Sequence, residues 1–266
     1  MAKVTFETLN HNAALFYELK GGNYTWWENI KKDPRLYIEI RKDNNINVYY
    51  EGGSVVKLHC SKNKKIQAFT HRKYLLGDGV GYKECSLDND LETIIKNIPD
   101  KYSGKKGYEK ENWSEKYIQS QYIIKYHSDY IDSEFAYKDN LFDIRVDLIK
   151  CINGELRFVE LKRLDDNRML KINDDNPEVV EQVKAYTEFI HKYKKEIIEY
   201  YKKIWSIKNE LGLINTEKCP SSLAEKPLLL IFDRWTHSTS KRINHTQRLK
   251  EILDREKIDY VINEDI

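Results

Sequence analysis

The sequence predicts a mixed α/β (α+β) protein with two domains. Residues 1–98 are expected to form an antiparallel β-rich domain, because short stretches of alternating apolar and polar residues follow one another with turn residues between them. Residues 114–266 are expected to form a domain in which helices flank a mixed central sheet, because helical stripes and apolar runs of strand length share this region. The polar segment 99–113 (PDKYSGKKGYEKENW) separates the two patterns and is predicted to be a linker.

Composition narrows the class of protein further. Of the 266 residues, 40% are hydrophobic, which is enough for a core, and no run of about 18 apolar residues could span a membrane. The N-terminal stretch MAKVTFETLN lacks the apolar segment of a secretory signal. The four cysteines lie far apart with no Cys-x-x-Cys pair, which argues for reduced thiols and against a structural zinc site. We therefore expect a cytoplasmic protein without a membrane partner.

The first domain is predicted to begin with a helix and continue as a meander. The helix covers residues 24–30 and ends before Pro34, because the residue that precedes a proline disfavours helix. Four strands are then expected over 35–42, 46–51, 54–60 and 65–70. The first is the clearest, since Leu36, Ile38 and Ile40 alternate with polar residues at the period of a strand.

The second domain is predicted to contain seven elements. Asn176 and Pro177 are expected to be the N-cap and first-turn residue of its longest helix, whose apolar residues recur every three or four positions. The elements are a helix over 114–124, a strand over 133–138, a hairpin over 145–163, the long helix to about Trp205, a strand over 227–232, a helix over 243–257 and a strand over 259–262.

The hairpin RVDLIKCINGELRFVELKR turns at Asn153-Gly154, the strongest two-residue hairpin signal, because both residues tolerate positive φ. Counting outward from this turn, Asp147 lies opposite Glu160, with Cβ atoms about 4.5–5.5 Å apart. Lys162 is two residues beyond Glu160 and shares its face. The sequence therefore places two carboxylates and one ammonium on the same face of the sheet.

The surroundings of these charges are apolar on both faces of the hairpin. Two like charges on such a face repel each other and lose hydration, so the arrangement alone would not stabilise the fold. A divalent cation removes the conflict, because Mg²⁺ and Mn²⁺ prefer hard oxygen ligands. A metal and the Lys162 ammonium beside a phosphate would form a phosphodiester-hydrolysis site. The alternative is an ordinary cross-strand salt-bridge cluster of Asp147, Glu160 and Lys162.

This pattern resembles the PD-(D/E)XK nuclease superfamily. Asp147, the Glu160-Leu161-Lys162 triplet and the segment from Gln182 to Tyr186 are most similar to RecB-type nucleases and to the mismatch-cutting archaeal endonucleases. The resemblance covers about residues 114–190, and Val146 stands where the family usually has a proline before the aspartate. It implies a restriction-endonuclease-like core in the order helix, strand, strand, strand, helix, strand.

The resemblance also implies roles for individual residues. Asp147 and Glu160 would hold Mg²⁺ or Mn²⁺ together with the main-chain carbonyl of Leu161, and Lys162 would position the attacking water. These four residues would form the metal centre of a hydrolase.

Further residues are implied on the two helices that flank the hairpin. Gln182 and Tyr186 are four residues apart, so they would lie on one helix face and point at the active site; for Tyr186, simple core packing is an equal alternative. The family places a glutamate on the first helix, and Glu115 matches that position best, with Glu111 and Glu134 as alternatives.

A basic stretch in the first domain is a candidate nucleic-acid surface. Between Gly52 and Gly77 there is no Asp or Glu, and the chain carries six basic residues there: Lys57, Lys62, Lys64, Lys65, Arg72 and Lys73. Such a patch could follow the phosphates of a nucleic acid. The alternative is an edge strand that lysines protect from aggregation.

The sequence thus predicts a metal-dependent nuclease that cleaves phosphodiester bonds of nucleic acid, DNA in preference to RNA, with endo- or exonuclease action left open and a homodimer as a candidate assembly. One alternative is a catalytically silent nuclease-fold module that binds nucleic acid or protein. Another is a two-part sensor or toxin of a bacterial defence system, in which the first domain recognises a trigger.

Overall fold

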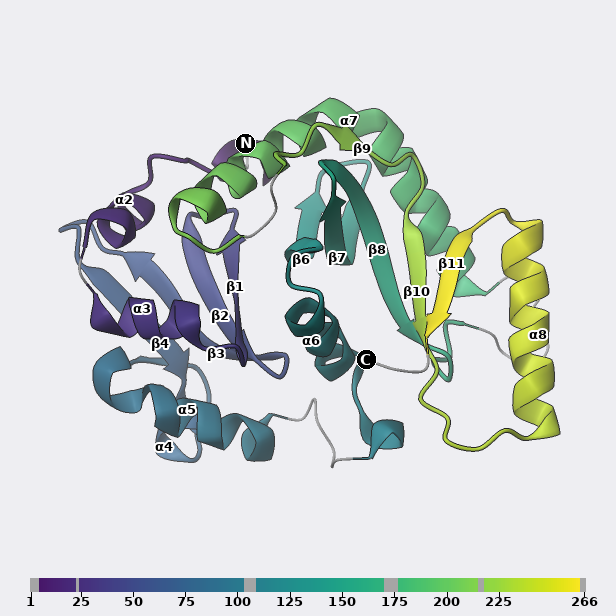
Figure 1. The fold of residues 1–266 in the computed structure, drawn as a ribbon, viewed down its shortest axis with the longest axis horizontal. Coiled ribbons are helices and arrows are strands. Elements are labelled where there is room, and N and C mark those ends of the chain that lie inside the picture. The colour runs from purple at the N-terminus through teal and green to yellow at the C-terminus, as the bar shows by residue number, and fades with distance from the viewer. Residues whose placement is uncertain (1–4, 23, 103–108, 170–176, 215–217, 264–266) are drawn as a thin grey trace.

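The computed structural model describes residues 5–22, 24–102, 109–169, 177–214 and 218–263 (Figure 1). It contains two β-sheets with helices around them, which confirms the predicted mixed α/β class. One sheet is antiparallel and comes from the first part of the chain; the other is mixed and comes from the second part. No helix in the described part of the chain is long and apolar enough to cross a membrane.

The first sheet is the predicted meander with one additional strand. Its strands lie in the order of the sequence: β1 (Leu36–Arg41), β2 (Asn45–Tyr50), β3 (Gly53–Cys60), β4 (Ile66–His71) and β5 (Tyr82–Glu84). Helix α3 (Thr25–Lys32) corresponds to the predicted first helix. The sequence did not predict β5 or the helices α1 (Thr5–Thr8), α2 (Ala14–Gly21), α4 (Arg72–Leu76) and α5 (Leu87–Lys101).

Helix α5 continues to Lys101, so residues 99–101 of the predicted linker are helical. Ile94, Ile95 and Ile98 are buried on one side of this helix and hold its last turn against the core. Residues 103–108 of the proposed linker lie outside the described residues, and Lys110–Asn112 forms a 3₁₀ turn. The turn residues of segment 99–113 predict a loop, whereas burial of Ile94, Ile95 and Ile98 keeps the chain helical to Lys101.

The second sheet has the order β11-β10-β8-β7-β6, with the short β9 (Ser222–Leu223) beside β8. Strands β6 (Tyr130–Lys138), β7 (Asp143–Ile152) and β8 (Glu155–Arg163) are antiparallel neighbours. Strands β10 (Leu228–Phe232) and β11 (Asp259–Asn263) continue the sheet in parallel with β8. The sheet is therefore mixed, as the sequence predicted.

Helices cover both faces of the second sheet. On one face, Ile118 of α6 (Glu115–Lys125) belongs to one buried cluster with Leu148 and Leu161. On the other face, Val183 of α7 (Glu178–Glu210) and Leu249 of α8 (Ser240–Arg255) belong to one buried cluster with side chains of β10. This two-sided cover explains why β8 and β10 are apolar along both faces.

Helix α7 joins the two parts of the structure. It contacts β8 near its start and β1 near its end, and Figure 1 shows it arching past both sheets. Its backbone departs from helical geometry at Tyr193, where φ is −114° and ψ is 22°. The predicted N-cap Asn176 lies outside the described residues, and Pro177 occupies the cap position in the structure. One hydrophobic cluster contains buried residues of both sheets.

Candidate active site

The predicted pairing of the two hairpin strands is correct near the turn, but the ladder of paired residues ends before it reaches Asp147 and Glu160. Asn153 and Gly154 both have positive φ, 54° and 83°. The pairs run from Ile152 opposite Glu155 to Leu148 opposite Val159, as predicted. The next expected pair, Asp147 with Glu160, is not part of the ladder.

Asp147 takes the place of a backbone acceptor where the two strands part. Its Oδ2 accepts a hydrogen bond from the Leu161 backbone N–H at 3.0 Å. Because this N–H would otherwise be buried without a partner, the side chain completes the hydrogen bonding of β8. Because the ladder is interrupted here, the Asp147 carboxylate lies between β7 and β8, close to Lys162.

Lys162 lies at the centre of the site. Its side chain is 1% exposed, and its Nζ lies 3.7 Å from Asp147 Oδ2 and 4.0 Å from Glu115 Oε1. The same ammonium forms an ion pair with Glu160 and donates to the Leu161 carbonyl at 3.0 Å. Carboxylates from three different elements, α6, β7 and β8, therefore surround one buried ammonium.

Burial and mutual repulsion shift the titration of this cluster. The pKa of Glu160 is raised to about 7, first by burial and then by the charge of Asp147. Burial also raises the pKa of Asp147 and of Glu115, although Lys162 opposes the shift in both. Burial lowers the pKa of Lys162, but its three carboxylate neighbours outweigh burial and leave that pKa raised. Lys162 is therefore a charged group at neutral pH and is unsuited to act as a general base.

The structure brings Gln182 and Tyr186 to Glu160. Gln182 Nε2 donates to Glu160 Oε1 at 2.6 Å, and the Tyr186 hydroxyl lies 2.8 Å from Oε2. The two side chains also contact each other at 2.7 Å, as their spacing of four residues on α7 predicts. Tyr186 is buried as well, so it packs in the core and holds the site carboxylate at the same time.

Of the three candidate glutamates, the structure places Glu115 beside Lys162. Its Oε2 lies 3.6 Å from Arg168 Nη2 and is buried without a hydrogen-bond partner among the described residues. Glu111 instead accepts hydrogen bonds from Thr236. Glu134 forms an ion pair with Lys116, next to the site but not at its centre.

Gln119 is a site residue that sequence reasoning missed. Only 2% of it is exposed, and its Nε2 donates to the Asp147 backbone carbonyl at 2.5 Å and to Glu134 at 2.9 Å. It thus ties α6 to the strand that carries Asp147. Its spacing of four residues from Glu115 on one helix was the available signal.

The residues present suit a divalent cation in charge and chemistry. Asp147, Glu160 and Glu115 together carry more negative charge than Lys162 neutralises, and Arg168 is itself matched by Asp166 at 2.7 Å. Glu115 Oε2, which is buried without a hydrogen-bond partner among the described residues, and the raised pKa values of the carboxyl groups fit a bound cation. Against this, no group of three or more His, Cys, Asp or Glu side chains has metal-binding geometry in the described ranges.

The six basic residues of the first domain lie on β3, on the β3–β4 turn and on α4. Lys57 is 4.0 Å from Asp43, and Lys73 lies 5.0 Å from the centre of the Tyr74 ring. Lys62, Lys64 and Lys65 are exposed at the turn, and no ion pair joins them to a carboxylate within the described part of the chain. The turn is therefore the most accessible part of the predicted patch.

Comparison of the chain with protein-family models, with curated proteins and with solved structures found no match. The contacts of the site residues themselves define its chemistry. Those contacts join Glu115, Asp147, Glu160 and Lys162 in one cluster.

Proposed function

We propose that this protein is a metal-dependent nuclease of the PD-(D/E)XK type that hydrolyses phosphodiester bonds of nucleic acid. The observation that carries the proposal is the cluster of three carboxylates around the buried Lys162 ammonium. The order α6, β6, β7, β8, α7, β10 also supports it, because it is the element order that the sequence resemblance implies.

Asp147, Glu160 and the Leu161 carbonyl would hold Mg²⁺ or Mn²⁺. When bound, such an ion lowers the pKa of a coordinated water and polarises a phosphate. Lys162 would orient the attacking water and stabilise negative charge that develops on the phosphate, since its ammonium stays protonated. Gln182 and Tyr186 would keep the Glu160 carboxylate in place through their hydrogen bonds.

Binding of the cation would be linked to loss of a proton. Burial and the charge of Asp147 raise the pKa of Glu160 to about 7, so a proton competes with the cation for this carboxylate near neutral pH. A carboxylate binds a cation only after this proton is lost. We therefore expect metal affinity to rise between about pH 6 and pH 8.

The exposed lysines of the β3–β4 turn support a polyanionic substrate. Positive side chains without a carboxylate partner attract phosphates and release counterions when they bind. The preference for DNA over RNA comes from the sequence resemblance. The first domain would then contribute to substrate binding and the second to cleavage.

The test is a cleavage panel of single-stranded, duplex, branched and mismatched DNA and RNA, with Mg²⁺, Mn²⁺ or EDTA. Cleavage should require the metal, and Lys162→Ala should abolish cleavage while nucleic-acid affinity stays within about twofold. Lys138→Ala is a matched control, because Lys138 is an exposed lysine at the end of β6, in the same sheet as Lys162. The Lys138→Ala variant should cleave normally. Undiminished cleavage by Lys162→Ala would reject the role of this residue.

One observation favours the silent binding module as a second candidate. Both Glu160 oxygens already accept hydrogen bonds inside the protein, from Gln182 and Tyr186. A site that evolved only to be stable could satisfy its carboxylate in this way. Nucleic-acid binding without cleavage in any metal of the panel would favour this second function.

A further inference from the structure

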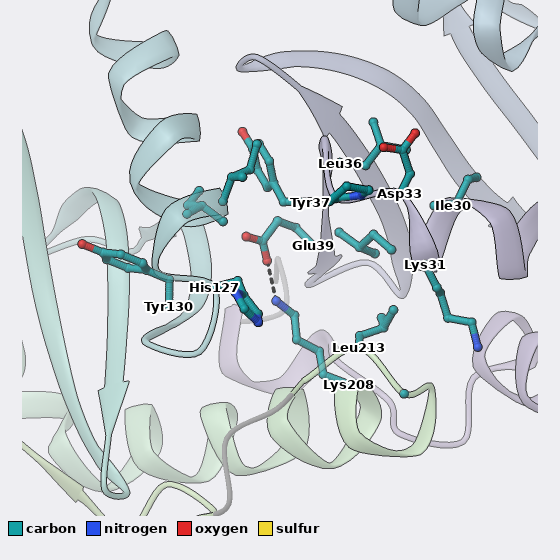
Figure 2. Close-up of a pocket in the computed structure, with 15 residues that line it drawn as sticks. Ile30, Lys31, Asp33, Leu36, Tyr37, Glu39, His127, Tyr130, Lys208 and Leu213 are labelled. Atoms are coloured by element: carbon teal, nitrogen blue, oxygen red, sulfur yellow. Dashed lines mark hydrogen bonds and ion pairs between the residues drawn. The ribbon is translucent and has the colours of Figure 1, made fainter. Parts of the chain in front are cut away.

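A second candidate site lies between the two sheets, in a cavity of about 380 Å³ that we call the β1–α6 cavity (Figure 2). It is formed by α3, β1, α6, β6 and the C-terminal end of α7, so both parts of the chain contribute walls. Figure 2 shows Glu39 and Lys208 meeting in the middle of the view, with Tyr37 above them and His127 beside them. Its volume is within the range of small-molecule pockets, roughly 300–1,000 Å³.

A buried ion pair lines this cavity. Lys208 Nζ lies 2.8 Å from Glu39 Oε2, and the two side chains are only 7% and 3% exposed. Ser133 donates to the other Glu39 oxygen at 3.1 Å, and Lys208 donates to the Ile131 carbonyl at 2.7 Å. Both groups are thus oriented by neighbours on β6.

The ion pair keeps unused hydrogen-bonding capacity. An ammonium has three N–H donors, of which Lys208 uses two in these contacts, and a carboxylate has about four acceptor positions, of which Glu39 uses two. A buried ion pair by itself is weak evidence for stability. A ligand that offers one acceptor to Lys208 and adjacent donors to Glu39 would complete both groups.

The remaining walls favour a flat ligand. Tyr37 lines the cavity, and its ring is fixed by stacking on Tyr49, with ring centres 4.9 Å apart and planes inclined by 12°. Leu36, Ile123 and Leu213 add apolar surface. Aromatic and apolar walls around a few oriented polar groups are the usual composition of a site for a planar heterocycle.

We propose that the β1–α6 cavity binds a guanine base, presented as a nucleoside or nucleotide. Guanine carries its O6 acceptor next to the N1–H and N2–H₂ donors, which is the pattern that Lys208 and Glu39 together can bind. Adenine offers an amine where guanine has O6, so it would place a donor against the ammonium. The inference does not depend on the proposed nuclease function, because it concerns a different cavity.

The experiment is calorimetric titration of the intact protein with guanosine, adenosine and 1-methylguanosine in EDTA. These probes carry no phosphate, so binding to the basic patch or to a metal is not measured. Guanosine should bind roughly 5- to 100-fold more tightly than adenosine, because a good bidentate base contact discriminates between bases over about this range. 1-Methylguanosine should bind more weakly than guanosine by a similar factor, because it lacks the N1–H donor.

Two variants place the binding in this cavity. Ile124→Trp fills the half-buried rim without altering the ion pair and should abolish guanosine binding, whereas Val80→Trp, at a position that is 92% exposed, should not. Glu39→Gln keeps the size of the side chain and should weaken the binding of guanosine at least tenfold. Thermal unfolding confirms that each variant folds. No guanosine binding, equal binding of all three probes, or unchanged binding to Ile124→Trp would overturn the proposal.

Discussion

Glu160 gives the site a measurable dependence of stability on pH. Folding raises the pKa of this carboxyl from its ordinary value of 4.5 to about 7, so the folded protein binds more protons than the unfolded chain between these values. The corresponding stability is complete below about pH 4.5 and is lost as the pH rises to about 7. At about 1.4 kcal/mol for each pH unit, the difference between 7 and 4.5 corresponds to about 3 kcal/mol of unfolding free energy lost by pH 8.

The perturbation is Glu160→Gln, which keeps the shape of the side chain and stays neutral at every pH. The unfolding free energy of the variant minus that of the wild type should increase by about 2–3 kcal/mol from pH 5 to pH 8. Asp132, whose pKa burial also raises to about 7, titrates in both proteins and cancels from this difference. Urea unfolding at pH 5, 6.5 and 8 in EDTA measures it.

A difference that stays constant from pH 5 to pH 8 would refute the reasoning, because Glu160 would then have an ordinary pKa. Glu225→Gln is the matched control, since that side chain is 77% exposed. Adding Mg²⁺ at pH 8 should stabilise the wild type more than Glu160→Gln. Equal stabilisation of both proteins would show that Glu160 is not a metal ligand.

Three further predictions concern other parts of the molecule. Gln119→Leu should lower cleavage roughly 10- to 100-fold without changing nucleic-acid affinity, because the hydrogen bonds that orient the site strand are lost; normal cleavage kinetics would contradict this role. Reversing Lys62, Lys64 and Lys65 to Glu should weaken nucleic-acid binding and flatten its salt dependence in a titration series, and an unchanged slope would make the patch plain surface. Gly52→Ala should lower the unfolding free energy by roughly 1–3 kcal/mol, because φ is +82° and the added Cβ would lie 2.6 Å from the Lys116 carbonyl oxygen; an unchanged urea midpoint would exclude this strain.

Gly52 also shows how the first sheet bears on the site. The β2–β3 turn approaches the backbone of Lys116 in the first turn of α6, directly after Glu115. The site helix is therefore supported by the first sheet on one side and by the second sheet on the other. Strain at this turn would reach the helix that carries Glu115.

Elements whose pattern is local were predictable from the sequence. The alternation around Ile38 and Ile40 gave β1, and the Asn153-Gly154 turn gave the hairpin and its register near the turn, because positive φ at two residues admits few alternatives. The alternation of side chains along β8 places Glu160 and Lys162 on one face. By contrast, α5 was missed because its last turn contains Pro99 and depends on burial against the first sheet.

The contacts that bring the site residues together depend on how separate helices and strands pack. Glu115, Glu111 and Glu134 are chemically the same, and Glu115 reaches Lys162 because of where α6 packs on the sheet. The side chain of Asp147 replaces a ladder hydrogen bond, and Glu39 meets Lys208 across 169 residues of sequence. The sequence by itself determined the local elements and the residue types of the site, because these follow from short-range periodicity and turn chemistry. The tertiary structure alone decided which distant side chains share a buried space, because that depends on the packing of whole helices against sheets.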